Sequence, residues 1–223
     1  MYGDPQLVKD MLRLYAVTDR RWLDNESLED QVERAIRGGA TCVQLREKDL
    51  PYERFVQEAR RLRTLCSAYH VPLLINDNVE IALEVGADGV HVGMADMDPV
   101  QVRRLAGDRL IIGVTAKTVQ QALAAQAAGA DYLGSGAVFG TMTKLDARPM
   151  SRELLAEIVR SVSIPVVAIG GIDRQNIEGL RGTGVAGAAV VSGIFAAKDI
   201  EAECRHLRRL ADLVAEGSRI CSR

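Results

Sequence analysis

The sequence is poor in cysteine and histidine, and the spacing of the few present argues against several kinds of site. Its four cysteines, Cys42, Cys66, Cys204 and Cys221, form no CxxC pair and have no metal-ligand spacing. The three histidines form no cluster with the spacing of zinc ligands. A disulfide framework and a zinc site are therefore disfavoured, and we expect the cysteines to be reduced thiols.

The sequence also lacks a strong net charge and a long apolar run. With a formal net charge of -2, the chain has no overall attraction to nucleic acid or to an anionic membrane. Neither is expected as a partner, and any phosphate must be bound by local groups. No run is apolar enough for a membrane span, and the first ten residues mix acidic and basic side chains without the apolar core of a signal peptide. We expect a cytoplasmic protein.

What the sequence does contain is a globular composition and a regular alternation of two patterns. Of its 223 residues, 48% are hydrophobic and 26% are charged, and the length suits one large domain or a complete eight-unit barrel. After a short helix that starts at Asp4 and Pro5, eight apolar runs alternate with helical segments. The first run is Leu14 to Val17, and Ser27 is expected to cap the helix after it.

An internal repeat indicates how these units assemble. "GGATCVQL", "VGADGVHV", "AGADYLGS" and, more weakly, "TGVAGAAV" join a helix end to the second, fourth, sixth and eighth apolar runs. Glycine suits the left-handed position that ends a helix, and a fourfold repeat of two modules closes more naturally than it forms an open sheet. The rival, a doubly wound open sheet, lacks its GxGxxG fingerprint after the first run. We therefore predict an α/β fold, a (β/α)8 TIM barrel forming a single domain over residues 1–223.

In such barrels, functional side chains lie at the carboxyl ends of the strands, and the last two loops commonly bind phosphate. Gly170 and Gly171 follow the seventh run, and Ser192 and Gly193 follow the eighth. Their backbone N–H groups and the Ser192 hydroxyl suit a phosphate, although tight turns alone would also explain the glycines.

The second run ends in "QLREK". Alternation places Gln44, Arg46 and Lys48 on the inner side, with Val43 and Leu45 toward the helices. Two cations are thus expected at the barrel mouth, against the alternative of a solvated charged loop.

Two acids follow neighbouring strands: Asp77 ends "PLLIND" and Asp96 ends "GVHVGMAD". Neighbouring strands lie about 5 Å apart, so both carboxylates can reach one cation, and Mg²⁺ is commonly held by one or two carboxylates plus phosphate oxygens. The alternative is that both acids cap the helices that follow.

The loop "FGTMTKLDARP" adds Thr141, Thr143 and Lys144, two hydroxyls and one cation, to the same rim. The mouth is thus equipped for two phosphorylated ligands, one of them a diphosphate. We expect His91 to be an interior histidine paired with a neighbour and Lys117 to be a solvated rim residue.

Together these motifs resemble the thiamine phosphate synthase family, from residue 14 to about residue 197. The matching segments are "QLREKD", "INDNVEIALEVGADGVHVG", Asp96, "GVTAKT", "TMTK", "AIGGI" and "VVSGIF". The resemblance implies condensation of 4-amino-5-hydroxymethyl-2-methylpyrimidine diphosphate with a thiazole monophosphate. The products are thiamine monophosphate and diphosphate, formed by a dissociative route that needs Mg²⁺ and no organic cofactor.

The resemblance also assigns roles to residues. Asp77 and Asp96 would ligate Mg²⁺, and Arg46, Lys48, Lys144 and Thr115 would be catalytic. The substrate-binding set would be Gln44, Leu45, Arg46, Glu47, Lys48, Asn76, Thr115, Thr141, Met142, Thr143, Lys144, Gly171, Val191 and Ser192.

The sequence departs from the family pattern in four places. Residues 94–95 are Met-Ala instead of Gln-Glu, Thr115 replaces serine, Lys117 replaces histidine, and Phe139-Gly140 replaces Tyr-Pro. None removes a diphosphate or metal contact. A thiazole tautomerase of the same fold, which needs no magnesium, and a non-catalytic barrel that binds a phosphorylated metabolite stay open as alternatives, as does a homo-oligomer.

Overall fold

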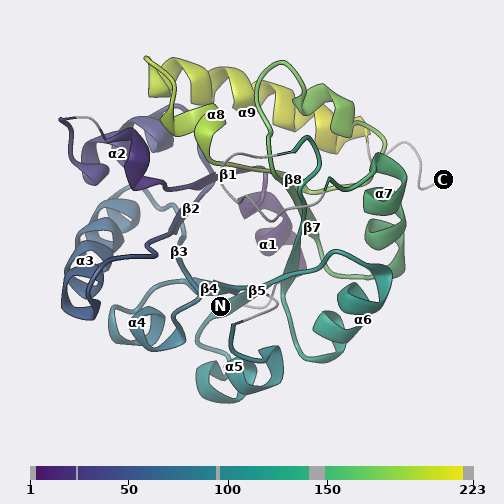
Figure 1. The fold of residues 1–223 in the computed structure, drawn as a ribbon, viewed down its shortest axis with the longest axis horizontal. Coiled ribbons are helices and arrows are strands. Elements are labelled where there is room, and N and C mark those ends of the chain that lie inside the picture. Colours follow the sequence, from purple (N-terminus) through teal and green to yellow (C-terminus); the bar gives the residue numbers. More distant parts are fainter. Residues whose placement is uncertain (1–3, 24, 94–95, 141–148, 218–223) are drawn as a thin grey trace.

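The computed structural model describes residues 4–23, 25–93, 96–140 and 149–217, and the described residues form a closed barrel of parallel strands (Figure 1). Each strand pairs with its sequence neighbours, and β8 pairs with β1. The predicted (β/α)8 barrel is confirmed. The strands are β1 (Leu14–Val17), β2 (Cys42–Leu45), β3 (Leu73–Asn76), β4 (Gly89–Val92), β5 (Ile111–Thr115), β6 (Tyr132–Gly136), β7 (Val166–Ile169) and β8 (Gly187–Val190).

Helices surround this ring of strands in Figure 1, and the short helix expected before the first strand is present. Asp4 caps it by accepting a hydrogen bond from Gln6 N (2.8 Å), and Ser27 caps α2 in a capping box with Asp30, as predicted. The helices are α1 (Pro5–Met11), α2 (Leu28–Arg37), α3 (Tyr52–Ala68), α4 (Val79–Glu84), α5 (Pro99–Ala106), α6 (Val119–Ala127), α7 (Arg152–Ser161), α8 (Ser192–Phe195) and α9 (Ile200–Gly217), with 3₁₀ helices η1 (Arg20–Trp22) and η2 (Ile177–Leu180).

The α-helix expected after the seventh strand, in "QNIEGLRG", is not present in the structure. The structure has only the four-residue 3₁₀ helix η2 there. Gly179 lies inside it, and Gly182, with φ +80°, comes next after the C-cap residue Arg181. Glycine gives up more backbone entropy in a helix than other residues, and a positive φ ends a right-handed helix, so the segment stops after one turn.

The hydrophobic core has two parts, separated by the barrel wall. Outward-facing strand residues such as Val43 and Leu45 pack against the helices in the larger cluster. The smaller cluster fills the barrel interior, where Tyr15 and Tyr132 meet Met11 and Leu12 from the end of α1. Helix α1 thus closes the bottom of the barrel, and in Figure 1 it appears within the ring of strands.

The predicted glycine joints adopt the conformation that the repeat requires. Gly39, Gly86, Gly129 and Gly184 have φ values of +108°, +64°, +88° and +87°. This is the left-handed region that glycine adopts without a Cβ clash. Each joint ends a helix or a helical turn and lets the next strand begin within three residues, which confirms the prediction.

Three joints also bind an N–H group at the start of the preceding strand, the first residue of β1 and β3 and the second residue of β5. Thr41 Oγ1 accepts from Leu14 N (2.9 Å), Asp88 Oδ2 accepts from Leu73 N (2.8 Å), and Asp131 Oδ2 accepts from Ile112 N (2.7 Å). The residue before β2, β4 and β6 therefore binds the odd-numbered strand beside it through its side chain, so three of the four repeats share the same hydrogen bond.

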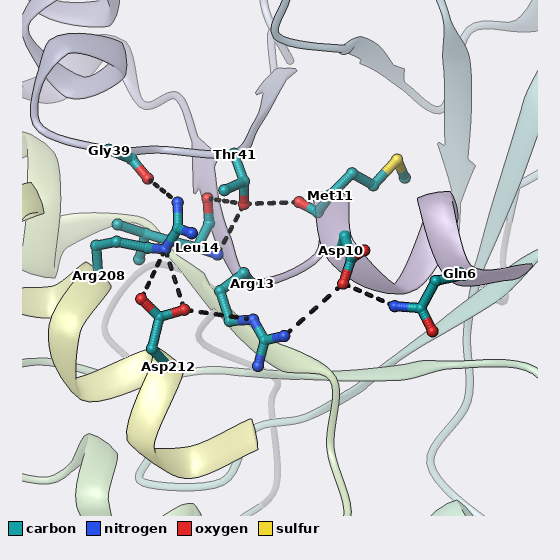
Figure 2. Close-up of polar contacts among 9 residues, drawn as sticks. All are labelled: Gln6, Asp10, Met11, Arg13, Leu14, Gly39, Thr41, Arg208 and Asp212. Carbon is teal, nitrogen blue, oxygen red and sulfur yellow. Dashed lines mark hydrogen bonds and ion pairs between the residues drawn. The ribbon is translucent and has the colours of Figure 1, made fainter. Parts of the chain in front are cut away.

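Ion pairs at the bottom of the barrel join the two ends of the described chain (Figure 2). Arg13 lies between Asp10 of α1 (3.8 Å) and Asp212 of α9 (3.5 Å). Arg208 also contacts Asp212 (3.1 Å), and it donates to the carbonyl of Gly39 (3.2 Å). These contacts hold α9 against the joint that leads into β2.

Among the described residues, no helix combines the length and the apolar character needed to span a membrane. Cys42, Cys66 and Cys204 are buried free thiols, as expected. Burial raises the pKa of Cys66 and of Cys204 to about 12, so both remain protonated and unreactive at neutral pH. Cys221 lies outside the described residues.

The Thr41 hydroxyl is expected to stabilise the bottom of the barrel. It accepts from Leu14 N and also lies 2.8 Å from the Met11 carbonyl oxygen, to which it can donate. Thr41→Val should lower the free energy of unfolding by about 1–3 kcal/mol, because it leaves a buried N–H without an acceptor. Urea denaturation checks this value. Thr64→Val, which removes an exposed hydroxyl bonded to Arg60 O, should change the stability by less than about 0.5 kcal/mol, and equal effects of the two variants would contradict the prediction.

Candidate active site

A pocket opens at the carboxyl ends of the strands, where function was expected. Its wall combines polar side chains from β2 to β5 with small and apolar residues from β6 to β8. The lining residues are Val17, Gln44, Arg46, Lys48, Asn76, Asp77, His91, Gly93, Asp96, Thr115, Lys117, Gly136, Ala137, Ile169, Gly170, Gly171, Ile172, Ala189, Val191 and Ser192.

The end of β2 supplies the cations, and the alternation of its side chains is as predicted. Gln44, Arg46 and Lys48 line the pocket. The side chain of Leu45 is fully buried between the barrel and the helices, so it does not line the pocket. The backbone N–H of Arg46 donates to the buried Thr18 hydroxyl (3.0 Å), which anchors the start of the loop.

Glu47 points away from the pocket and belongs to a charge cluster that the sequence did not indicate. Arg20 pairs with Glu47 (2.9 Å) and also contacts Glu58 on α3. Both carboxylates are largely buried, and burial raises the pKa of Glu58 above its ordinary value. One guanidinium thus holds the "QLREK" loop onto α3 and fixes the backbone between Arg46 and Lys48.

Asp77 and Asp96 both reach the pocket from the loops after β3 and β4. Asp77 has φ +63°, an uncommon conformation for a residue other than glycine, and its N–H donates to the His91 carbonyl (2.8 Å). Asn76 Nδ2 donates to Asp77 Oδ1 (2.7 Å), and Asp96 Oδ2 accepts from Gly93 N (2.7 Å). These bonds orient the carboxylates.

The helices that follow these loops are capped by other residues. Asn78 caps α4 by accepting from Ile81 N (2.9 Å), and Asp98 caps α5 by accepting from Val100 N (2.8 Å). The alternative interpretation of Asp77 and Asp96 as helix caps is therefore wrong. Both acids line the pocket without a capping duty.

The electrostatics of the two acids suit a cation. Burial raises the pKa of Asp77, the Lys48 ammonium in contact with it lowers the pKa, and the nearby Asp96 carboxylate raises it further. In the described part of the chain, no three His, Cys, Asp or Glu side chains form a group suited to a metal. A divalent cation here would take two protein carboxylates and complete its shell with water and ligand oxygens, as Mg²⁺ commonly does.

The loops after β7 and β8 form the other wall. Gly170 and Gly171 have φ values of +102° and +66°, and a Cβ at Gly171 would lie 1.8 Å from the Gly140 carbonyl oxygen. Ser192 begins the one-turn helix α8 and lines the pocket beside Val191. Positions 170 and 171 therefore require glycine for their backbone conformation, so part of the role of these glycines is to form a tight turn.

Part of the predicted site lies outside the described residues. Four residues of the predicted substrate-binding set, Thr141, Met142, Thr143 and Lys144, lie outside the described residues, as do Met94 and Ala95. The other predicted side chains, apart from those of Leu45 and Glu47, line one pocket. Lys117 also lines it, although it was expected only at the solvated rim.

A chain of hydrogen bonds crosses the barrel interior beneath the pocket. Gln44 Nε2 donates to Tyr15 Oη (2.6 Å), Tyr15 Oη lies 3.0 Å from Tyr132 Oη, and Tyr132 Oη lies 2.9 Å from His91 Nδ1. His91 Nε2 in turn lies 3.1 Å from Thr115 Oγ1. The expectation that His91 is paired is confirmed. The tyrosines were missed, and the signal for them was their inward alternation within β1 and β6.

Comparisons with known proteins agree with this geometry. The family model described as thiamine monophosphate synthase matches residues 14–194. A thiamine-phosphate synthase of Ruminiclostridium cellulolyticum is 50% identical over 194 residues, which cover 87% of this chain and 92% of that protein. Thiamine-phosphate synthase 2 of Streptococcus pneumoniae is 44% identical over 208 residues, 93% of this chain and 99% of that protein.

A solved structure gives the same result. Thiamine phosphate pyrophosphorylase from Pyrococcus furiosus superposes with a TM-score of 0.86 at 40% identity, covering 93% of this chain and 98% of that one. Family model, relatives and solved structure agree over most of the chain. The chain therefore belongs to the thiamine monophosphate synthase family and is a transferase of thiamine biosynthesis.

Proposed function

We propose that the pocket binds a pyrimidine diphosphate and a thiazole monophosphate side by side, together with Mg²⁺, and joins them to thiamine monophosphate. The observation that supports this best is the pair Asp77 and Asp96. Both line the pocket, and other residues cap the helices beside them. Two carboxylates beside two cations suit a diphosphate that arrives with a divalent cation.

The diphosphate is held at the end of β2. Arg46 and Lys48 present their charges into the pocket, and Asn76 lies beside Asp77 at the same end. As the carbon–oxygen bond to the diphosphate breaks, negative charge grows on the leaving oxygens. Arg46 and Lys48 are positioned to stabilise that charge, and Lys144 is assigned the same role from the sequence. Such preorganised stabilisation is usually a large contribution to catalysis.

Asp77 and Asp96 would hold Mg²⁺. When bound, the cation would supply Lewis-acid neutralisation of the diphosphate oxygens. The remaining tasks belong to side chains of the pocket: Thr115 and Gln44 orient the pyrimidine ring, and Asn76 keeps Asp77 turned toward the pocket through a 2.7 Å hydrogen bond.

The thiazole monophosphate is assigned to the opposite wall. Gly171, Val191 and Ser192 line the pocket there, and the first N–H groups of a helical turn such as α8 have no partner within the helix. The phosphate oxygens would accept from these N–H groups and from the Ser192 hydroxyl. Thr141 and Thr143 are assigned to the same phosphate from the sequence.

Because one pocket holds both substrates, the reaction between them becomes effectively unimolecular. The bond to the diphosphate breaks, the aminopyrimidine stabilises the methylene cation that results, and the thiazole nitrogen forms the new carbon–nitrogen bond. Positioning of this kind contributes on the order of 7–11 kcal/mol in favourable cases. The apolar wall, including Ile169 and Ile172, excludes water that would otherwise capture the cation.

Two alternative functions would give a role to fewer of the pocket residues. A thiazole tautomerase would use the loops after β7 and β8 but would leave Arg46, Lys48 and the two acids without a task. A non-catalytic phosphometabolite-binding barrel would explain the glycine loops alone. The cytoplasmic location, a homo-oligomer and the extent of the single domain over residues 1–223 stay predictions.

The two carboxylates should be essential for coupling. Asp77→Asn and Asp96→Asn should each lower the rate of diphosphate release from the two substrates by about 10²-fold or more, because charge stabilisation in the transition state is lost. Release is measured with Mg²⁺ and with EDTA, and EDTA should abolish it in the unaltered chain. Asp98→Asn, which alters the cap of α5 next to the site, is the matched control and should retain activity. Unchanged coupling in both pocket variants would refute the metal role.

Lys48 should contribute to diphosphate affinity. Lys48→Ala should weaken binding of the pyrimidine diphosphate by about tenfold to a hundredfold, because a charged hydrogen bond is worth about 1.5–3 kcal/mol. Isothermal calorimetry without the thiazole phosphate measures this directly. Lys198→Ala removes an exposed lysine outside the pocket and should leave the affinity unchanged. Equal affinity of the Lys48 variant and the unaltered chain would remove Lys48 from the site.

A further inference from the structure

The hydrogen-bonded chain beneath the pocket takes its direction from the Gln44 side-chain amide, whose Nε2 faces Tyr15 Oη. Its order is Gln44, Tyr15, Tyr132, His91 and Thr115, with separations of 2.6, 3.0, 2.9 and 3.1 Å. The two ends line the pocket, whereas the two tyrosines are at most 1% exposed and lie below it. The chain therefore links β2 and β5, the two ends of the polar wall, through the core.

Both tyrosines remain protonated, so each has one hydrogen to donate. Burial raises the pKa of Tyr15 and of Tyr132 well above the ordinary value for tyrosine. The nearby Cys42 raises the pKa of Tyr15 further, and Tyr15 does the same for Tyr132. A buried hydroxyl without an acceptor is costly. Each of these two hydrogens must therefore find an acceptor within the chain.

The direction follows from the first bond. Gln44 donates to Tyr15 Oη, so the Tyr15 hydrogen is left for Tyr132 Oη. The Tyr132 hydrogen then goes to His91 Nδ1, which must be unprotonated. His91 therefore carries its hydrogen on Nε2 and donates it to Thr115 Oγ1, and the Thr115 hydroxyl is left to donate. The opposite direction between the tyrosines would leave the Tyr15 hydrogen without an acceptor.

The barrel wall is shaped to hold this chain in place. A Cβ at Gly113 would lie 2.1 Å from the Tyr132 ring, and a Cβ at Gly134 would lie 2.9 Å from His91 Cε1. The rings of Tyr15 and Tyr132 pack edge to face with centroids 6.2 Å apart. Neither ring can rotate away without losing packed contacts, so the core fixes the order of the side chains along the hydrogen-bonded chain.

We propose that Tyr15, Tyr132 and His91 are positioning residues that present Gln44 Oε1 as an acceptor and the Thr115 hydroxyl as a donor, and so select a 4-aminopyrimidine over its 4-oxo analogue. This inference rests on the proposed function of the pocket. An aminopyrimidine offers a donor in its amino group and acceptors in its ring nitrogens. The 4-oxo form replaces the amino donor with a carbonyl acceptor and protonates a ring nitrogen, so it is mismatched at one or both ends.

The first test measures selectivity by calorimetry with each pyrimidine diphosphate alone. The unaltered chain should prefer the 4-amino compound by about tenfold or more, since one mismatched hydrogen bond costs about that much. Tyr132→Phe, which interrupts the chain at its middle, should reduce the preference by about tenfold while leaving the KM for the thiazole phosphate unchanged. Tyr15→Phe should act in the same direction. Tyr69→Phe, which removes an exposed hydroxyl bonded to Glu33, is the matched control.

The second test uses the unaltered chain and needs no turnover. Nitrogen-15 NMR of the histidine side chains should give His91 as the neutral ring protonated on Nε2, with His70 and His206 as internal references and His91→Asn for the assignment. A ring protonated on Nδ1, or on both nitrogens, would overturn the proposal, as would an unchanged preference in Tyr132→Phe. Absence of diphosphate release by the unaltered chain would instead count against the proposed function.

Discussion

Closure of the parallel barrel is the constraint on which the rest of the structure depends. Because β8 pairs with β1, every strand has two neighbours, and the pleat must send alternate side chains into one shared interior. Gln44 and Thr115 face the pocket for this reason, and Leu45 turns to the helices. The interior is narrow, so a large side chain on one strand requires a small one beside it, as Gly113 does for Tyr132.

Much of this architecture could be predicted from local patterns. The strands and most helices follow from apolar periodicity and caps, and the joints follow from glycines that must take a positive φ. The placement of Gln44, Arg46, Asp77 and Asp96 at one mouth needed only the barrel and the rule that parallel strands end at one rim. These inferences succeed because each depends on a few neighbouring residues.

The features that were missed depend on residues far apart in the sequence. Tyr15 and Tyr132 are 117 positions apart, and their hydroxyls meet only after the barrel closes. Arg20, Glu47 and Glu58 come from three separate segments of the chain and form ion pairs only in the folded protein. No residue near Glu47 in the sequence therefore predicts that Glu47 turns away from the pocket. The helix predicted after β7 was wrong for another reason. The apolar spacing of that segment favours a helix, but its glycines shorten it to the 3₁₀ helix η2.

The charges of the pocket explain how two acids can be kept together in a folded protein. Two carboxylates in proximity repel one another, and here the Lys48 ammonium rests on Asp77 and offsets that repulsion. In the proposed reaction, Asp77 and Asp96 would hold a divalent cation whose charge offsets theirs, and Lys48 would then be available to a diphosphate oxygen. The same lysine would thus serve first the two carboxylates and then the leaving group.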